Sequence, residues 1–135
     1  MEKSDKELLI KDLLMRVQHN VKVEISFTGF NSVSRLELYH IQQLFTENGI
    51  KIKPYLRPME SIKKEERAEM GEVIHSHRGN PYGKINYEGV DNLLLASIRM
   101  CNALTDWLLK NNFDFHGLIE KDLAIPITEE NNPYK

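Results

Sequence analysis

The stretch DNLLLASIRMCNALTDWLLKN, residues 91–111, carries the longest continuous helical pattern in the 135-residue chain. Two apolar stripes run along it at a spacing of three and four residues, which indicates one amphipathic helix. The first stripe holds Leu94, Ile98, Cys101, Leu104 and Leu108, and the second holds Leu93, Met100, Ala103 and Trp107. Because this apolar arc is wider than a surface helix needs, we expect the helix to be an interior rod, covered by another helix and by a small sheet.

The ends of this helix are also marked in the sequence. Asp91 is a suitable N-cap, and Asn111 and Asn112 suit a C-terminal stop because Asn tolerates the left-handed conformation. Polar residues interrupt the apolar pattern, so it predicts a core helix and not a membrane span. Cys101 lies on an apolar stripe and is expected to be a small buried hydrophobe.

Length and composition predict one cytoplasmic domain. The chain is 41% hydrophobic and 28% charged, which is typical of globular proteins, and its formal net charge is −2. No strong global field therefore favours nucleic acid or a membrane surface. A single cysteine excludes an internal disulfide, and the first residues lack the apolar core of a signal peptide. We expect one domain over residues 1–127 and a frayed tail over 128–135.

The first part of the chain predicts a helix and then a strand. Residues 5–17 repeat apolar positions at helical spacing, with Ser4 as N-cap and a solvated face that includes Asp12. Residues 21–27 alternate strictly between apolar and polar, which predicts a strand with one buried face, and residues 28–31 are expected to form a turn.

The middle of the chain is expected to add short elements to a small sheet. Residues 33–38 favour a strand and 39–48 a helix, although a single helix over 32–48 remains an alternative; residues 50–53 favour a short strand. Pro54 and Pro58 argue against a helix interior or a central strand between them. Together these patterns predict an α+β fold in which the long helix packs with the N-terminal helix and a mostly antiparallel sheet of two to four strands.

Three further elements are expected. Residues 61–76 form a charged surface helix, and residues 77–88 a long loop of a length that is often functional. A short helix over 118–123 precedes an apolar extended segment, residues 124–127, which is suited to pack or to pair with a sheet edge.

Two motifs, KPYLRPM at residues 53–59 and FDFHGLIEKDLA at residues 113–124, carry a resemblance to known proteins. In their order and spacing they resemble a widespread family of small uncharacterised proteins of gut Bacteroidetes and their prophages and mobile elements. This resemblance implies an accessory protein of a phage-like or integrated element, and it implies no activity.

The first motif suggests a contact site. Tyr55 and Arg57 between two prolines form a rigid arm with residue types that are favoured at protein interfaces. The competing interpretation is that Arg57 pairs with Asp114 or Glu120 and locks the arm to the second motif. Asp114 and His116 are also close enough in sequence to pair as carboxylate and base. The candidate binding residues are therefore Tyr55, Arg57, Asp114, His116 and Glu120.

A basic segment over residues 51–67 suggests nucleic-acid binding as the alternative function. It contains Lys51, Lys53, Lys63, Lys64 and Arg67, but glutamates lie among these cations and cancel much of their field. A solvated charged helix is the competing interpretation.

Metal binding and catalysis have less support in the sequence. Glu72, His75 and His77 are the nearest approach to a metal site, yet a site needs three or four converging ligands. The chain lacks a phosphate-binding glycine loop, a nucleophile elbow and an HExxH motif, so we expect no cofactor and no enzymatic activity. The leading hypothesis is a noncatalytic protein that binds another protein.

Overall fold

The computed structural model describes residues 2–46, 49–76 and 92–135, and of residues 92–96 the backbone only. The chain divides into two compact units, one of Met1–Ser61 with Leu109–Lys135 and one of Ile62–Leu108. The first unit holds α1 (Lys3–Arg16), β1 (Lys22–Phe27), β2 (Phe30–Arg35), α2 (Leu38–Gln43), β3 (Lys51–Leu56), the 3-10 turn η1 (Met59–Ser61) and β4 (Ile125–Pro126). The second holds α3 (Lys64–Ser76) and all but the end of α4 (Asn92–Lys110). The predicted α+β class is confirmed.

The sheet has the strand order β2-β1-β3-β4. β1 pairs antiparallel with β2 and with β3, whereas β4 pairs parallel with β3. The sheet is therefore mixed and not mostly antiparallel as the sequence suggested. The parallel strand comes from the extended segment after the second motif, as expected for residues 124–127.

The turn of the β1–β2 hairpin is shorter than the sequence indicated. Thr28 and Gly29 both have positive φ, 43° and 85°, as a two-residue hairpin turn of the primed type requires. Phe27 therefore pairs directly with Phe30, and residues 30 and 31, predicted to be part of a turn, belong to β2. The strand-then-helix interpretation of residues 32–48 is confirmed, with both elements starting earlier than predicted.

Pro54 lies within β3, which has a neighbour on each side, so the expectation that this segment is not a central strand is wrong. The Leu36 N–H donates to the Val21 carbonyl at 2.9 Å. This bond fixes which residues of β1 direct their backbone groups to β2 and which direct them to β3. Odd-numbered residues of β1 bond to β2, and even-numbered residues bond to β3. Pro54 lies opposite Val23, so its nitrogen faces away from β1. β4 pairs only with Tyr55 and Leu56, so the missing N–H costs no ladder bond.

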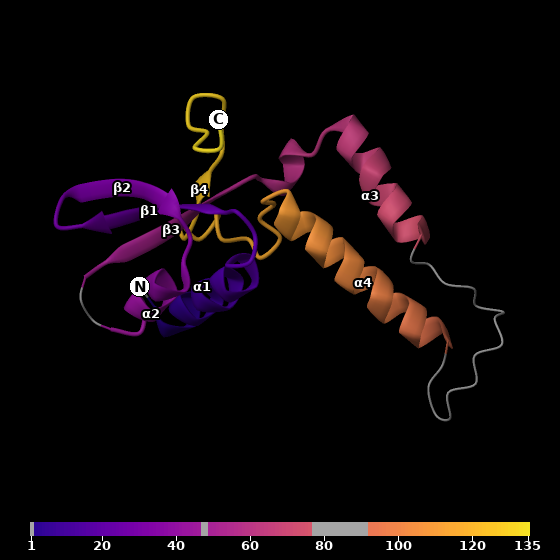
Figure 1. Ribbon diagram of the computed structural model, residues 1–135, viewed down its shortest axis with the longest axis horizontal. Coiled ribbons are helices and arrows are strands. Elements are labelled where there is room, and N and C mark those ends of the chain that lie inside the picture. Colours follow the sequence, from indigo (N-terminus) through magenta and orange to yellow (C-terminus); the bar gives the residue numbers. More distant parts are fainter. Residues whose placement is uncertain (1, 47–48, 77–91) are drawn as a thin grey trace. The chain divides into compact units, whose positions relative to one another are not determined.

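The hydrophobic core belongs to the first unit. In Figure 1, α1 and α2 lie together on one side of the sheet. The core combines residues of α1, the sheet, α2 and the C-terminal segment: Leu9, Leu13, Val21, Val23, Leu36, Ile41, Leu44, Ile52, Leu56, Leu118, Leu123 and Ala124. Asp12 is fully buried, which corrects the prediction that it lies on a solvated face. α1 begins at Lys3 after Glu2, so Ser4 is not its N-cap.

The second unit contradicts the interior-rod prediction. None of the α3 side chains is buried. On α4, Trp107 and Leu108 are buried, but Ile98 is 48% exposed and Cys101 is exposed. Leu93 and Leu94 lie outside the described side chains. A helix buries its apolar stripe only where another apolar surface faces it, and the glutamate-rich α3 offers only a thin apolar edge. The contact between the two helices is partly polar, since the Trp107 indole donates to Glu69 at 3.0 Å.

The termini of these elements agree in part with the sequence. Asn112 has φ of 62° at the end of α4, which confirms the predicted stop. Residues 118–122 form turns, so the predicted helix over 118–123 is wrong. The predicted loop 77–88 lies outside the described residues. None of the described helices is long and apolar enough to cross a membrane.

Candidate functional site: the junction of two motifs

The two sequence motifs meet in the first unit. Arg57 and Phe113 form a parallel β-bridge. The Arg57 N–H donates to the Asn112 carbonyl at 2.7 Å, and the Asp114 N–H donates to the Arg57 carbonyl at 2.9 Å. The expectation that the two motifs contact each other is therefore confirmed, and the contact is made by the backbone.

The Arg57 side chain lies against the junction. Its guanidinium carbon is 4.2 Å from the centre of the Phe113 ring, and Nη2 donates to the Ser61 carbonyl at 3.3 Å. Stacking on an aromatic face stabilises a guanidinium and limits its freedom. These contacts support a structural role for Arg57, in which it locks the arm to the second motif.

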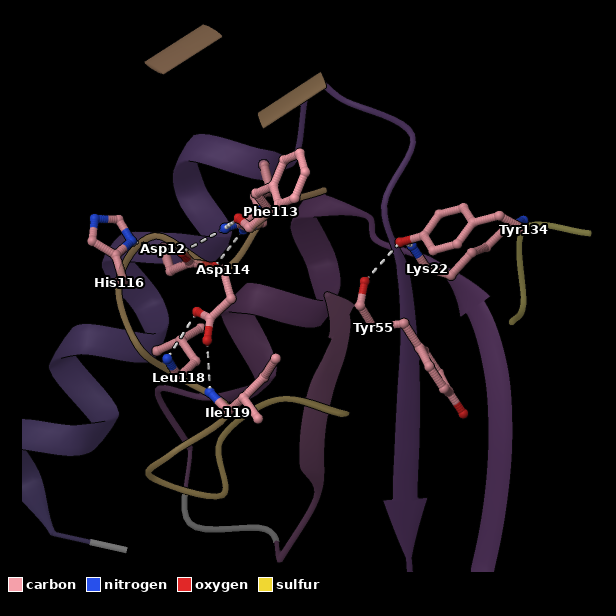
Figure 2. A network of polar contacts seen from close by, with 10 residues as sticks. Asp12, Lys22, Tyr55, Phe113, Asp114, His116, Leu118, Ile119 and Tyr134 are labelled. Carbon is pink, nitrogen blue, oxygen red and sulfur yellow. Dashed lines mark hydrogen bonds and ion pairs between the residues drawn. The ribbon is translucent and has the colours of Figure 1, made fainter. Parts of the chain in front are cut away.

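Asp114 organises the turn that follows it. Its Oδ1 accepts from the Leu118 N–H at 2.8 Å, and its Oδ2 accepts from the Ile119 N–H at 3.0 Å. Both bonds are visible in Figure 2. Gly117 has φ of +72°, a conformation that favours glycine and lets the chain reverse between the carboxylate and these amides. Asp114 thus acts as a cap for residues 118–122.

His116 pairs with Asp12 and not with Asp114. The distance from His116 Nδ1 to Asp12 Oδ1 is 2.6 Å. Asp12 also accepts from Arg16 Nε at 2.6 Å, and Arg16 Nη2 donates to the Phe113 carbonyl at 2.7 Å. Asp12 and Arg16 are fully buried, so α1 holds the second motif by a buried ionic cluster at two points (Figure 2).

This cluster is suited to bracing the fold. A buried ion pair stabilises a fold when hydrogen bonds satisfy most of its polar atoms. Arg16 Nε and Nη2 bond to Asp12 and to the Phe113 carbonyl, and only Nη1 has no hydrogen-bond partner among the described residues. The spacing of Asp12 and Arg16 by four residues is a detectable helix-pair signal in the sequence, but sequence reasoning assigned Asp12 to the solvated face. The third member, His116, lies 104 positions away and has no local signal.

Tyr55 is buried, so it is not available as a contact residue. Burial raises the pKa of the Tyr55 phenol, and the neighbouring Glu24 carboxylate, which accepts a hydrogen bond from the phenol hydroxyl at 3.4 Å, raises this pKa further.

The Tyr134 hydroxyl lies between β1 and β3 and extends their ladder. It accepts from the Lys22 N–H at 2.9 Å and donates to the Tyr55 carbonyl at 3.0 Å, the two groups that would form the next ladder pair (Figure 2). Burial raises the pKa of Tyr134 to about 12. Residues 128–135, predicted to be frayed, thus include one anchored side chain.

A cavity of about 260 Å³ opens at the junction of the motifs. Its lining joins three residues after Arg57 with five from the second motif: Pro58, Met59, Glu60, Asp114, Phe115, Gly117, Ile119 and Glu120. Glu60 and Glu120 are exposed, whereas Asp114 is buried and bonded to backbone amides. Of the predicted binding residues, Asp114 and Glu120 therefore lie at one cavity.

The residues of the basic segment are divided between the two units. Lys51 and Lys53 belong to β3 in the first unit, and Lys63, Lys64 and Arg67 belong to the second. Lys53 Nζ lies 3.0 Å from Asp122 Oδ1, and Glu66 accepts from the Lys63 N–H at 3.0 Å. Asp122 thus offsets the charge of Lys53 locally, whereas Glu66 contacts the neutral backbone amide of Lys63.

The predicted metal ligands are only partly described. Glu72 and His75 are exposed at the end of α3, and His77 lies outside the described residues. Within the described part of the chain, no group of three His, Cys, Asp or Glu side chains is placed to hold a metal ion.

The chain was also compared with known proteins. No protein-family model, no curated protein and no solved structure matches it. The resemblance of the two motifs to proteins of gut Bacteroidetes and their mobile elements therefore stays a prediction from the residues themselves.

Proposed function

We propose that this chain is a noncatalytic accessory protein of a phage-like or mobile element, and that it binds another protein through the cavity at the motif junction. The observation that carries the proposal is the cavity itself. Apart from Glu60, its walls come from the two stretches on which the family resemblance rests, and those stretches are joined by backbone pairing between Arg57 and Phe113.

The lining suits a long side chain with an apolar stem and a cationic head. Pro58, Met59 and Ile119 supply apolar wall, and the exposed Glu60 and Glu120 supply negative charge. Lysine and arginine combine an apolar stem with a charged tip, so they match both parts. Arginine is also one of the residues that dominate binding energy at protein interfaces.

The walls are held in place before any partner arrives. The Arg57–Phe113 bridge fixes one side of the cavity, and the Asp114 carboxylate fixes the turn on the other by bonding the amides of Leu118 and Ile119. A preformed site loses less conformational entropy on binding than a site that must order itself. This rigidity supports the binding of a partner protein in preference to catalysis that needs a moving lid.

The test is affinity capture from the source cells with the immobilised protein, followed by direct binding to each captured protein. The double variant Glu60→Lys and Glu120→Lys reverses the charge at the cavity and should lose the specific partner. The control Glu129→Lys and Glu130→Lys makes the same charge change at exposed residues outside the cavity lining and should keep it. Equal capture by both variants, or no specific capture by the native chain, contradicts the proposal.

Nucleic-acid binding through residues 51–67 is the alternative proposal. Its affinity for a short DNA or RNA duplex should fall steeply with salt, because each neutralised phosphate releases counterions. Binding that is absent at low ionic strength, or that does not change with salt, removes this alternative.

A further inference from the structure

β2 is the terminal strand of the sheet, and among the described residues no strand pairs with its outer edge. The Leu36–Val21 hydrogen bond sets the phase of the β1–β2 ladder, so Ser32 and Ser34 direct their backbone groups to β1. The intervening residues Asn31, Val33 and Arg35 therefore direct their N–H groups outward. The edge presents three regularly spaced donors, with the acceptors that accompany them.

This edge carries little of the protection that natural edge strands usually have. Such edges are commonly blunted by charged residues, proline or bulges. β2 has the sequence FNSVSR, with a single charge at Arg35 and no proline, and its six residues pair with β1 without a bulge. Five of the six are exposed. An unblunted exposed edge of this kind is suited to pairing with another strand.

Exposed apolar side chains lie at both ends of the same edge. Phe30, at the turn end, is 79% exposed. Leu38 and Tyr39, which begin α2 just beyond the other end, are each 55% exposed. Phe30 shares a sheet face with the buried Val23 and Ile52, the face on which α1 and α2 lie (Figure 1).

We propose that β2 pairs antiparallel with β2 of a second copy of this chain, about a two-fold axis that passes through Val33. In this register Val33 of one copy lies opposite Val33 of the other, and Asn31 lies opposite Arg35. These are the outward-facing residues, so every outward N–H of the edge gains an acceptor. A neutral amide opposes each guanidinium, and no like charges meet.

The exposed apolar side chains at the two ends of β2 explain why the partner strand belongs to a second copy of this chain. Antiparallel pairing about a two-fold places the turn end of one β2 beside the α2 end of the other. Phe30 of each copy then meets Leu38 and Tyr39 of its partner on the same sheet face, so both exposed apolar groups are covered by one symmetric interface. A two-fold interface of this type must be self-complementary, and this edge satisfies that condition. The interface lies apart from the cavity, so the dimer can be tested independently of the proposed function.

Sedimentation and disulfide trapping test the dimer and its register together. The native chain should sediment at twice its 15.8 kDa mass, and the charge-introducing variant Val33→Glu should sediment as a monomer with an unchanged circular dichroism spectrum. In a Cys101→Ser background, Val33→Cys should form a disulfide-linked dimer on mild oxidation, because paired Cα atoms in such a ladder lie about 5.5 Å apart.

Asn31→Cys in the same background is the matched control. In the proposed register the two copies of residue 31 lie four residues apart along the strands, about 13 Å, which is too far for a disulfide. The double variant Asn31→Cys and Arg35→Cys should again crosslink, because residue 31 faces residue 35 of the partner. A monomeric native chain, or equal crosslinking of the single variants at residues 31 and 33, overturns the proposal.

Discussion

The two units of the chain differ in where their buried residues come from. The core of Met1–Ser61 with Leu109–Lys135 gathers apolar side chains from both ends of the chain. In Ile62–Leu108, α3 buries none of its side chains and α4 leaves Ile98 exposed. The second unit nevertheless carries the strongest helical pattern in the sequence. The comparison teaches that side chains of this protein are buried where segments from distant parts of the sequence meet. A strong apolar pattern along a single helix does not by itself lead to burial.

The units also differ in their polar contacts. In the first, the buried Asp12 and Arg16 bind the backbone and imidazole of the second motif, about a hundred residues away. In the second, the Trp107–Glu69 bond joins two helices through an exposed carboxylate. If stability resides mainly in the first unit, substitutions there should have large effects and matched substitutions elsewhere small ones.

The largest effect is expected for Asp12→Ala. It leaves the buried Arg16 guanidinium without its carboxylate and removes the partner of His116, so the free energy of unfolding should fall by about 3–5 kcal/mol. Asp5→Ala, on the same helix, removes a surface pair with Lys121 at 3.5 Å and a carboxylate from the first turn of α1, and should cost about 1 kcal/mol or less. Urea denaturation of both variants measures the difference. Equal losses of the free energy of unfolding would show that the buried cluster does not stabilise the fold.

The next effect is expected for Leu118→Ala. Leu118 is fully buried in the core, and its truncation should cost about 2–5 kcal/mol. Ile98→Ala removes a comparable apolar side chain from the exposed face of α4 and should change the free energy of unfolding by about 0.5 kcal/mol or less. Thermal and urea melts of the pair compare the two units directly. A larger loss for Ile98→Ala would reverse the assignment of the core.

A smaller effect is expected for Tyr134→Phe. The substitution removes the hydroxyl that joins the Lys22 N–H to the Tyr55 carbonyl, and leaving such groups unpaired costs about 1–3 kcal/mol. Urea denaturation at neutral pH measures this loss. Lys135→Ala, beyond the anchored ring, serves as the control and should show no change.

The same residue gives a pH dependence. Because the Tyr134 pKa is raised from 10.0 to about 12, the folded state retains a proton that the unfolded chain releases above pH 10. The associated stability is complete below pH 10 and is lost as the pH rises toward 12. The raised pKa of Tyr55 acts in the same direction. Tyr134→Phe should flatten this alkaline decline, and an unchanged slope would show that the phenol is solvated in the folded state.

Much of the local structure could be predicted from the sequence, because it depends on local patterns. The alternation over residues 21–27 placed β1, and Asn112 marked the end of α4. Pro54 is compatible with a central strand because its nitrogen faces away from β1, and this orientation is set by the hydrogen-bonding pattern of the neighbouring hairpin, which the local sequence does not reveal. Phe30 lies in β2 and not in the predicted turn, because Thr28 adopts the left-handed conformation, which is uncommon for a residue other than glycine.

The candidate site was predictable only in part. Contact between the motifs followed from their distinctive sequences, and Asp114 and Glu120 do lie at the cavity that the motifs form. The pairing of His116 with Asp12 was beyond sequence reasoning, since it joins residues 104 positions apart and buries a charge that a helical pattern assigns to solvent. Long-range ionic contacts of this kind leave no periodic signal in a single sequence.

Amide hydrogen exchange on the native chain tests most directly the claim that the first unit carries the stability. The amides of β1 and β3 should exchange most slowly, near the free energy of global unfolding, and those of α3 should exchange orders of magnitude faster through local opening. Amides of α3 and α4 that are protected as strongly as those of β1, or more strongly, would contradict the account.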